Sequence, residues 1–396
     1  MSIFSKPIDL ITADDIKFLV ENNIPEGEQI DYKEIFHFEE KDKENGKKEF
    51  LKDISSFANK NGGKIIYGIK ENKKDHTFEI CGLSLNNRSV RSVDAVKRQL
   101  VDIVSTGLTP SFNDLGFKEI SIDGKDLLIL HIPESWNKPH MVMADKKDVG
   151  SFWIRNNSQK MNMPYDFLKQ SFTSFSLVTQ EISRFVANKI EKIKKREIPI
   201  LLENHAQPQG IIHLIPLSSF KNNAFMPIQN IETQDIIPDK FEANHIHLKN
   251  RTNMDGKVFF PEDKGYQSFY IQLYRSGIFE TVFQLQHNPK ETHLIYGQQL
   301  KEKLISTLEK HLSFLQKKLF YPPILIVINF IKVKDYYLGE QDRLNIAHRV
   351  AEFHDTKADR EDLKFEIMLE KYEDQENIIE QTIIFLYEAF NHTDTK

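Results

Sequence analysis

Cysteine is nearly absent from this sequence, which has only Cys81 in 396 residues. One thiol excludes an internal disulfide and a thiolate cluster for structural zinc, and it is typical of a reducing compartment. No run of about 18 apolar residues occurs, so no membrane-spanning helix is predicted. Charged residues also appear too early in the N-terminal segment for the apolar core of a signal peptide. We therefore expect a soluble, cytoplasmic protein.

An excess of positive charge is also missing. The formal net charge is −5, so any binding of nucleic acid must come from a local basic surface. The Gly-x-x-x-x-Gly-Lys-Ser/Thr pattern of a phosphate-binding loop does not occur, which disfavours ATP binding of that kind. What is present is an ordinary globular composition, 40% hydrophobic and 28% charged, with 29 Phe residues that favour aromatic packing.

The first 165 residues predict a mixed α/β domain of the α+β class. Helices are predicted from Thr12 onward, at 47–60 and at 93–104, because apolar residues recur there at helical spacing. Strands are predicted at 29–35, 65–67, 78–80 and 152–155, with 78–80 as the partner of 65–67. Two further β-rich runs, 119–122 and 127–132, flank Asp123-Gly124 and predict a tight hairpin, since both turn positions need positive φ.

The rest of the chain predicts a long helix and a second domain. Residues 163–196 contain few helix breakers and predict one long helix or a broken pair, so we assign 166–198 to a linker helix. Residues 199–396 predict a second α/β domain of unrecognised type. Its strands are expected at 210–215, 243–248, 268–274, 278–285 and 324–330, and its helices at 297–318 and 370–390.

Three segments of the first domain form a recognisable set. They read EGEQIDYKE from Glu26, ISSFANKNGG from Ile54 and IIYGIKE from Ile65, and Gly82 closes the unit. In order and spacing they resemble the AlbA-type Schlafen domain over roughly residues 10–170. The resemblance implies an AlbA/Schlafen-like fold that handles nucleic acid. Asn and Gly in the Asn59–Gly63 turn are also what a helix-to-strand turn needs.

The same segments contain candidate catalytic residues. Asp31 and Lys33 alternate along a strand and so share a face, Glu26 lies just upstream, and Glu71 follows a second strand. If the strands pair, three carboxylates and an ammonium converge, and such oxygen ligands suit Mg²⁺ or Mn²⁺. The resemblance implies the same set, with Glu26, Asp31 and Glu71 as metal ligands and Lys33 at the phosphate. This chain departs from the family in Asp31, where Glu is common, and in Lys70-Glu71, where Asp-Asp is common. The alternative is an ordinary solvated face of a charged strand.

Several residues of this domain are candidates for nucleic-acid contact. Arg155 and Trp153 alternate on one strand and could stack on a base and neutralise a phosphate. Scattered basic residues more often form solvated faces of helices. The candidate set is Lys33, Lys60, Arg91, Arg98, Trp153 and Arg155.

The second domain offers no catalytic motif. His245 and His247 share a strand face, but no acidic or Cys partner stands at a fixed spacing from them, so a solvated or hydrogen-bonded pair is the better interpretation. We expect this half to sense a trigger or to set the oligomeric state. Schlafen nuclease cores resemble two AlbA-like lobes and this chain has one, so a homodimer through helices at 167–193 and 378–390 is predicted.

Three functions remain open at this point. The first is a divalent-metal-dependent endoribonuclease that acts on structured RNA such as tRNA, with a role in antiviral or antiphage defence by analogy alone. The second is a non-catalytic regulator that binds DNA or RNA through the same domain. The third is a sensor or interaction protein whose N-terminal domain is only a scaffold, which would lack salt-dependent affinity for nucleic acid.

Overall fold

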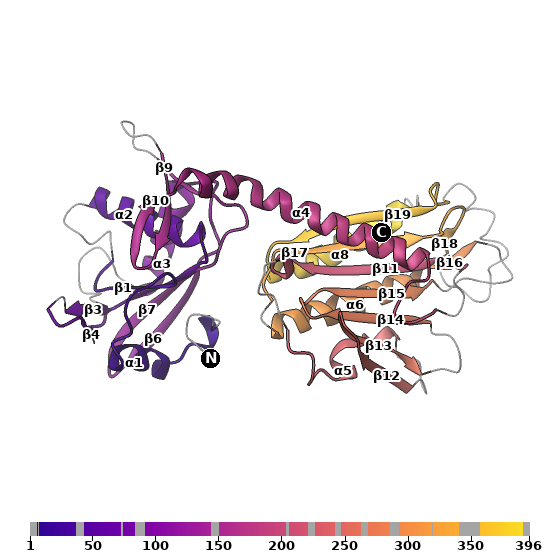
Figure 1. Ribbon diagram of the computed structural model, residues 1–396, viewed down its shortest axis with the longest axis horizontal. Helices are drawn as coiled ribbons and strands as arrows, with labels where there is room; N and C mark the ends of the chain where they lie inside the picture. Colours follow the sequence, from indigo (N-terminus) through magenta and orange to yellow (C-terminus); the bar gives the residue numbers. More distant parts are fainter. Residues whose placement is uncertain are drawn as a thin grey trace. The chain divides into compact units, whose positions relative to one another are not determined.

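A computed structural model describes most of the chain, in two compact units (Figure 1). The described residues are 6, 8–36, 43–72, 74–83, 92–143, 150–202, 206–220, 226–241, 247–262, 268–285, 293–318, 320–339 and 357–390. The units are Met1–Leu177 and Val178–Lys396, and helix α4 (Tyr165–Lys194) belongs to both. The predicted linker helix, 166–198, overlaps α4. None of the helices in these ranges is long and apolar enough to cross a membrane.

A four-stranded sheet forms the centre of the N-terminal unit. Its order is β1–β2–β7–β6, with β1 parallel to β2 and the other neighbours antiparallel. The strands are β1 (Ile30–Lys33), β2 (Gly63–Tyr67), β6 (Gly116–Ile122) and β7 (Lys125–Ile132). The predicted hairpin between β6 and β7 is confirmed, with φ of 51° at Asp123 and 79° at Gly124.

Helices cover both faces of this sheet. The side chains of Ile65 and Tyr67 pack with α2 (Lys43–Ala58) and α3 (Val93–Gly107), whereas Ile66 between them packs with α1 (Ala13–Glu21). Alternation along a strand therefore builds two separate cores. A short 3-10 turn, η2 (Ile8–Leu10), precedes α1. The three predicted helices are confirmed, and α1 follows Thr12, whose N–H donates to the Asp15 carboxylate over 2.7 Å.

Gly68 ends β2 and turns the chain out of the central sheet. Its φ of 98° lies in a region open mainly to glycine, and its N–H donates to Lys33 O over 2.8 Å. The next strand, β3 (Ile69–Asn72), pairs with β4 (Thr77–Ile80) in a two-stranded sheet. The predicted pairing of 78–80 with 65–67 is therefore wrong, because β2 pairs with β1 and β7 on its two edges.

A second small sheet lies against α2. Its order is β10–β9–β8–β5, formed by β5 (Leu108–Thr109), β8 (Met141–Val142), β9 (Ser151–Asn156) and β10 (Gln159–Asn162). Asn59, just after α2, connects this sheet to the helix, since its Nδ2 donates to His140 O and Trp153 O over 3.0 Å each. Gly62 must be small, because a Cβ there would lie 2.7 Å from Ile132 O.

The C-terminal unit is built on a seven-stranded antiparallel sheet in the order β12–β13–β14–β15–β11–β17–β19. Helices α6 (Gly297–Lys317) and α8 (Gln375–Ala389) share one core with it, together with the short α5 (Thr233–Ile236). The end of α4 crosses this sheet (Figure 1), and on that face Ile193 packs with Ile211, Val258 and Val282. The strands are β11 (Gln209–Pro216), β12 (His247–Thr252), β13 (Gly256–Glu262), β14 (Phe269–Tyr274), β15 (Phe279–Gln284), β17 (Ile324–Ile331) and β19 (Asp362–Leu369).

The remaining elements of this unit are short. A parallel pair, β16 (Leu294–Tyr296) and β18 (Tyr337–Gly339), and the 3-10 turns η4 (Leu217–Phe220), η5 (Asp239–Phe241) and η6 (Tyr372–Asp374) complete it. Predicted strands at 210–215, 268–274, 278–285 and 324–330 and the helix at 297–318 are confirmed. The predicted strand at 243–248 is displaced, since β12 runs from His247 and residues 242–246 lie outside the described ranges. The α+β class is confirmed, although β13 and β19 were not predicted.

Candidate functional site

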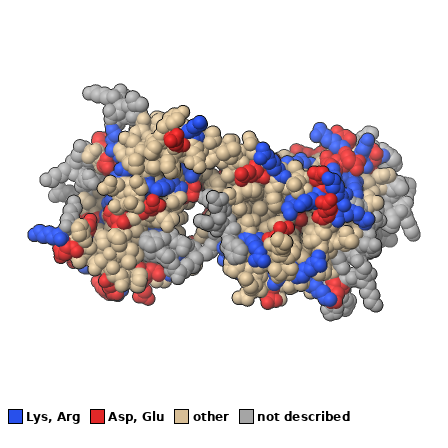
Figure 2. All heavy atoms as spheres, viewed as in Figure 1, with Lys and Arg blue, Asp and Glu red and all other residues tan. Residues whose placement is uncertain are grey.

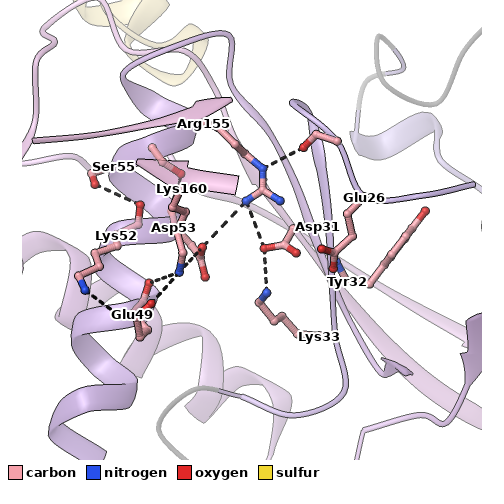
Figure 3. Close-up of polar contacts among 12 residues, drawn as sticks. Glu26, Asp31, Tyr32, Lys33, Glu49, Lys52, Asp53, Ser55, Arg155 and Lys160 are labelled. Atoms are coloured by element: carbon pink, nitrogen blue, oxygen red, sulfur yellow. Dashed lines mark hydrogen bonds and ion pairs between the residues drawn. The ribbon is translucent and has the colours of Figure 1, made fainter. Parts of the chain in front are cut away.

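Asp31 and Lys33 lie on the same face of β1, as their spacing predicted (Figure 3). Lys33 Nζ is 2.9 Å from Asp31 Oδ2. The Asp31 side chain is only 2% exposed, whereas that of Lys33 is 28% exposed. Burial opposes the charge on Lys33, but Asp31, Asp53 and Glu26 raise its pKa above the ordinary value. Lys33 is therefore a cation at neutral pH with access to solvent.

Arg155 lies behind Asp31 and is fully internal. Its Nη1 is 3.3 Å from Asp31 Oδ2, its Nε donates to Gly27 O over 2.8 Å, and its guanidinium lies 4.5 Å from the ring centre of Phe57. The side chain is 2% exposed. A buried guanidinium needs partners for its charge and its donors, and these contacts supply them. Arg155 therefore ties β9 to β1 and to α2.

Asp53 completes this charge cluster and was not predicted. It lies on α2 with a side chain 1% exposed, 2.8 Å from Lys160 Nζ and 4.0 Å from Arg155 Nη1. Lys160 stands opposite Arg155 in the β9–β10 pair and also contacts Glu49, one turn before Asp53, over 2.9 Å. A carboxylate among Phe50, Ile54 and Phe57 on the buried side of α2 was the signal in the sequence that could have revealed it.

Glu26 lies beside Asp31, just before β1 (Figure 3). Its Oε1 accepts the N–H of Tyr32 over 3.1 Å. Burial raises the pKa of Glu26 to about 7, and the hydrogen bond and charge of Asp31 act in the same direction. Among the described residues no donor reaches Asp31 Oδ1, which is buried. Glu26 thus holds its proton more strongly than an ordinary carboxyl group.

Glu71 is not part of this cluster. It lies on β3, beyond the turn at Gly68, and its carboxylate is 3.3 Å from His76 Nδ1. Glu26 and Asp31 could offer two oxygens to Mg²⁺ or Mn²⁺, but Asp31 Oδ2 already lies between two cations. In the part of the chain that the structure describes, no three His, Cys, Asp or Glu side chains are grouped to hold a metal ion. The predicted three-carboxylate site is therefore not assembled.

The predicted nucleic-acid contacts lie in different settings. The predicted contact of Arg155 with nucleic acid is corrected by the structure, because the guanidinium is buried and bound to other groups of the same domain. Lys60 contacts Glu28 and Arg155 O, both over 2.8 Å, and Lys52 covers the ring of Trp153 at 4.6 Å. Arg98 is exposed on α3. Arg91 and His245 fall outside the described residues. On the face in Figure 2, basic and acidic side chains are interspersed over this unit.

Comparison with known proteins identifies the N-terminal domain. Residues 26–164 match the family model described as Schlafen, AlbA_2. One similar solved structure is the N-terminal domain of an ATP-dependent DNA helicase RecG-related protein from Nitrosomonas europaea, 22% identical, covering 39% of this chain and 97% of that chain with a TM-score of 0.28. Another is DIP2311 from Corynebacterium diphtheriae, 14% identical, covering 34% of this chain and 25% of that one, with a TM-score of 0.25. No curated protein matches the chain. Residues 26–164 thus match the Schlafen AlbA_2 domain, as the motifs from Glu26 to Gly82 predicted.

Proposed function

We propose that the Schlafen AlbA_2 domain binds nucleic acid and acts as an endoribonuclease on structured RNA such as tRNA. The observation that carries this proposal is the grouping of Glu26, Asp31 and Lys33, in which two carboxyl groups lie beside a partly exposed ammonium. Such groups can take up a proton from an attacking oxygen and stabilise charge that develops on a phosphate. Structured RNA would be recognised mainly through its backbone and shape.

Each residue of the cluster has a distinct part in this proposal. Lys33, with its side chain 28% exposed, would contact the scissile phosphate. Glu26 would transfer protons, since a carboxyl group with a pKa of about 7 changes protonation near neutral pH. Asp31 would hold Lys33 in place, and Arg155 and Asp53 would position Asp31 from behind.

The sequence also predicted Mg²⁺ or Mn²⁺ as the cofactor. The described residues do not fit a three-carboxylate metal site, because Glu71 is paired with His76 on a separate hairpin. The proposed chemistry is therefore assigned to the protein side chains alone. Whether cleavage needs a divalent metal is decided by the chelator arm of the experiment below.

A non-catalytic regulator that binds DNA or RNA is the second candidate. One observation favours it, namely that the buried carboxylates of Asp31 and Asp53 are both held by cations of the same domain. A closed charge network of this kind can serve stability alone. Removal of an acid near the bound phosphates would then leave binding unchanged or strengthen it, since like-charge repulsion is relieved.

The test is cleavage of total tRNA by the purified full-length chain with Mn²⁺, Mg²⁺ or EDTA. We expect discrete fragments from the wild type and at least about a hundredfold less cleavage from Asp31→Asn and Lys33→Met, with tRNA binding retained for Asp31→Asn. Glu34→Gln is the matched control, since Glu34 lies just after β1 but pairs with Lys70 instead of the cluster.

Each outcome of this test separates the candidates. Salt-sensitive binding without cleavage by any sample supports the regulator and rejects the nuclease. Absence of salt-sensitive binding rejects both and supports a scaffold. Loss of activity in Glu34→Gln as large as in Asp31→Asn would show that the effect is not specific to the cluster. Thermal melting of every variant confirms that the domain is folded.

We also propose that the chain forms a homodimer. The support is the exposure of several large apolar side chains on α4, where the predicted dimer helix lies. These are Tyr165 at 76%, Phe167 at 46%, Phe172 at 63% and Leu177 at 53%. Tyr165 and Phe172 lie on one side of the helix, and large exposed apolar side chains grouped in this way mark sites of protein contact.

A further inference from the structure

The C-terminal unit contains a cavity that the proposed nuclease does not use. It lies between the last turns of α4 and the sheet, and its volume is about 340 Å³. All of its lining residues belong to this one unit. Its chemistry is set by Lys189, Lys192, Glu197, Asp255, Tyr274 and Glu280. A volume of this size is at the lower end for small-molecule sites.

An ionised carboxylate forms part of the wall of this cavity. Glu280 on β15 is 2% exposed. Its oxygens accept hydrogen bonds from Tyr270 Oη over 3.1 Å, Tyr274 Oη over 3.3 Å and His213 Nε2 over 3.2 Å. Burial opposes ionisation, but the contact with His213 and the charge of Lys189 keep the pKa of Glu280 below its ordinary value. The cavity therefore has a buried, hydrogen-bonded carboxylate in its wall.

An ammonium of the protein already occupies the aromatic part of the cavity. Lys189 Nζ lies 4.7 Å from the ring centre of Tyr274, which lines the cavity, and 5.5 Å from that of Phe185, which lies outside the cavity lining. The nearest carboxylate oxygen of an ion pair is Asp255 Oδ2, at 3.8 Å. That distance is long for a charged hydrogen bond, so the contact of the ammonium with the ring of Tyr274 also contributes to its position. A cation is thus the chemistry that this position accepts.

The charge of the lining selects between classes of ligand. Three carboxylates, those of Glu197, Asp255 and Glu280, face two ammonium groups, those of Lys189 and Lys192. A phosphate or carboxylate ligand would meet the carboxylates of Asp255 and Glu280, whereas a cation would gain their attraction and the aromatic face of Tyr274. We propose that this cavity binds a small organic cation, an alkylammonium or diamine, whose ammonium takes the place of Lys189 Nζ.

If the ammonium of the ligand takes the place of Lys189 Nζ, removal of the lysine charge should strengthen cation binding. Removal of a lysine with only a structural role should not. In Lys189→Met the side chain ends at Cε and is uncharged, so the position of the ammonium becomes free and putrescine should bind about tenfold more tightly than to the wild type. Lys192→Met is the matched control, because it removes an equal charge from the cavity lining without vacating the aromatic position. Putrescine should bind to this variant only about twofold more tightly than to the wild type. Asp255→Asn should weaken binding about fivefold. This carboxylate is 62% exposed, so the variant should fold normally.

The measurement is isothermal titration of the full-length chain with putrescine and with tetramethylammonium, and with inorganic phosphate as the anionic probe. Tighter cation binding in Lys189→Met than in Lys192→Met, with weaker binding in Asp255→Asn, establishes the site. Equal effects of the two lysine variants would mean that cation binding responds only to the total charge of the lining, and would overturn the proposal. Phosphate binding that is lost in Lys189→Met would overturn it in favour of an anion site. If Lys189→Met does not fold, unchanged binding in Asp255→Asn rejects the proposal.

Discussion

At the scale of single residues, Glu26 links the candidate site to pH. Burial, then the hydrogen bond and charge of Asp31, raise its pKa to about 7 from its ordinary value of 4.5. Between pH 4.5 and about pH 7, Glu26 therefore keeps a proton in the folded protein that it has released in the unfolded chain. The stability that this proton contributes is fully present below pH 4.5 and is lost as the pH rises through about 7.

The variant Glu26→Gln tests this linkage, because the amide resembles the protonated carboxyl group and does not titrate. Relative to the variant, the wild type should lose free energy of unfolding between about pH 5 and about pH 8. Since Glu26 is partly exposed, screening by solvent limits the loss to on the order of 1 kcal/mol. Urea unfolding of both proteins at the two pH values measures it, and parallel pH profiles would contradict the assignment.

A second prediction at the scale of single residues concerns Glu71 and the cleavage of tRNA. Its carboxylate contacts His76 on the β3–β4 hairpin and is separate from the cluster of Asp31. Cleavage of tRNA by Glu71→Gln should therefore stay within about twofold of the wild type, since a surface ion pair contributes little. A loss of a hundredfold in the same gel assay would show that Glu71 belongs to the active site after all, as its sequence position had indicated.

At the scale of elements, the two strands of the N-terminal site show what the sequence could and could not predict. Alternation placed Asp31 and Lys33 on one face correctly, because a strand has a period of two wherever it lies. Glu71 lies outside the cluster because β2 ends at Gly68, and the positive φ there turns the chain into β3, which pairs with β4 instead of joining the central sheet. Asp53 and Arg155 were missed as partners, since their burial depends on β9 packing against α2, a contact between distant segments.

Arg155 makes this packing of β9 testable. It is the cation shared by Asp31 of β1 and Asp53 of α2. Arg155→Met would leave both carboxylates buried with less compensation, and removal of one partner of a buried ion pair costs about 3–5 kcal/mol. The midpoint of the N-terminal transition in urea should fall accordingly. Because the chain has two units, the intrinsic fluorescence of Trp136 and Trp153, which both lie in the N-terminal unit, is used to follow that transition.

Double substitution is the control for this interpretation. Asp53→Asn in the Arg155→Met background removes one of the carboxylates that the first change left uncompensated. In the Arg155→Met background, Asp53→Asn should therefore lower the free energy of unfolding by less than it does in the wild type, with a difference of at least about 1 kcal/mol. Strictly additive effects would mean that Arg155 and Asp53 are not coupled, and that Arg155 acts through Gly27 and Phe57 alone.

At the scale of the whole molecule, the second unit was predicted as a class but not in detail. Its apolar strands were found because β11, β14, β15 and β17 have long buried runs. β19 reads Asp-Leu-Lys-Phe-Glu-Ile, and its two-residue alternation was a signal that was overlooked. The pairing of His213 with Glu280 could not be predicted, since it depends on the register between β11 and β15. Register is set by the complete sheet.

The oligomeric state is the last prediction at this scale. Tyr165 and Phe172 lie seven residues apart on α4, on one side of the helix, and are 76% and 63% exposed. We expect light scattering after gel filtration to give the mass of a dimer for the wild type. Tyr165→Ser with Phe172→Ser should shift the mass to that of one chain, because the apolar contact is removed. Leu10→Ser, which changes a 55% exposed side chain outside α4, should remain dimeric. A single-chain mass for the wild type from low to high micromolar concentration would contradict the dimer and leave the nuclease to be explained by one AlbA_2 lobe.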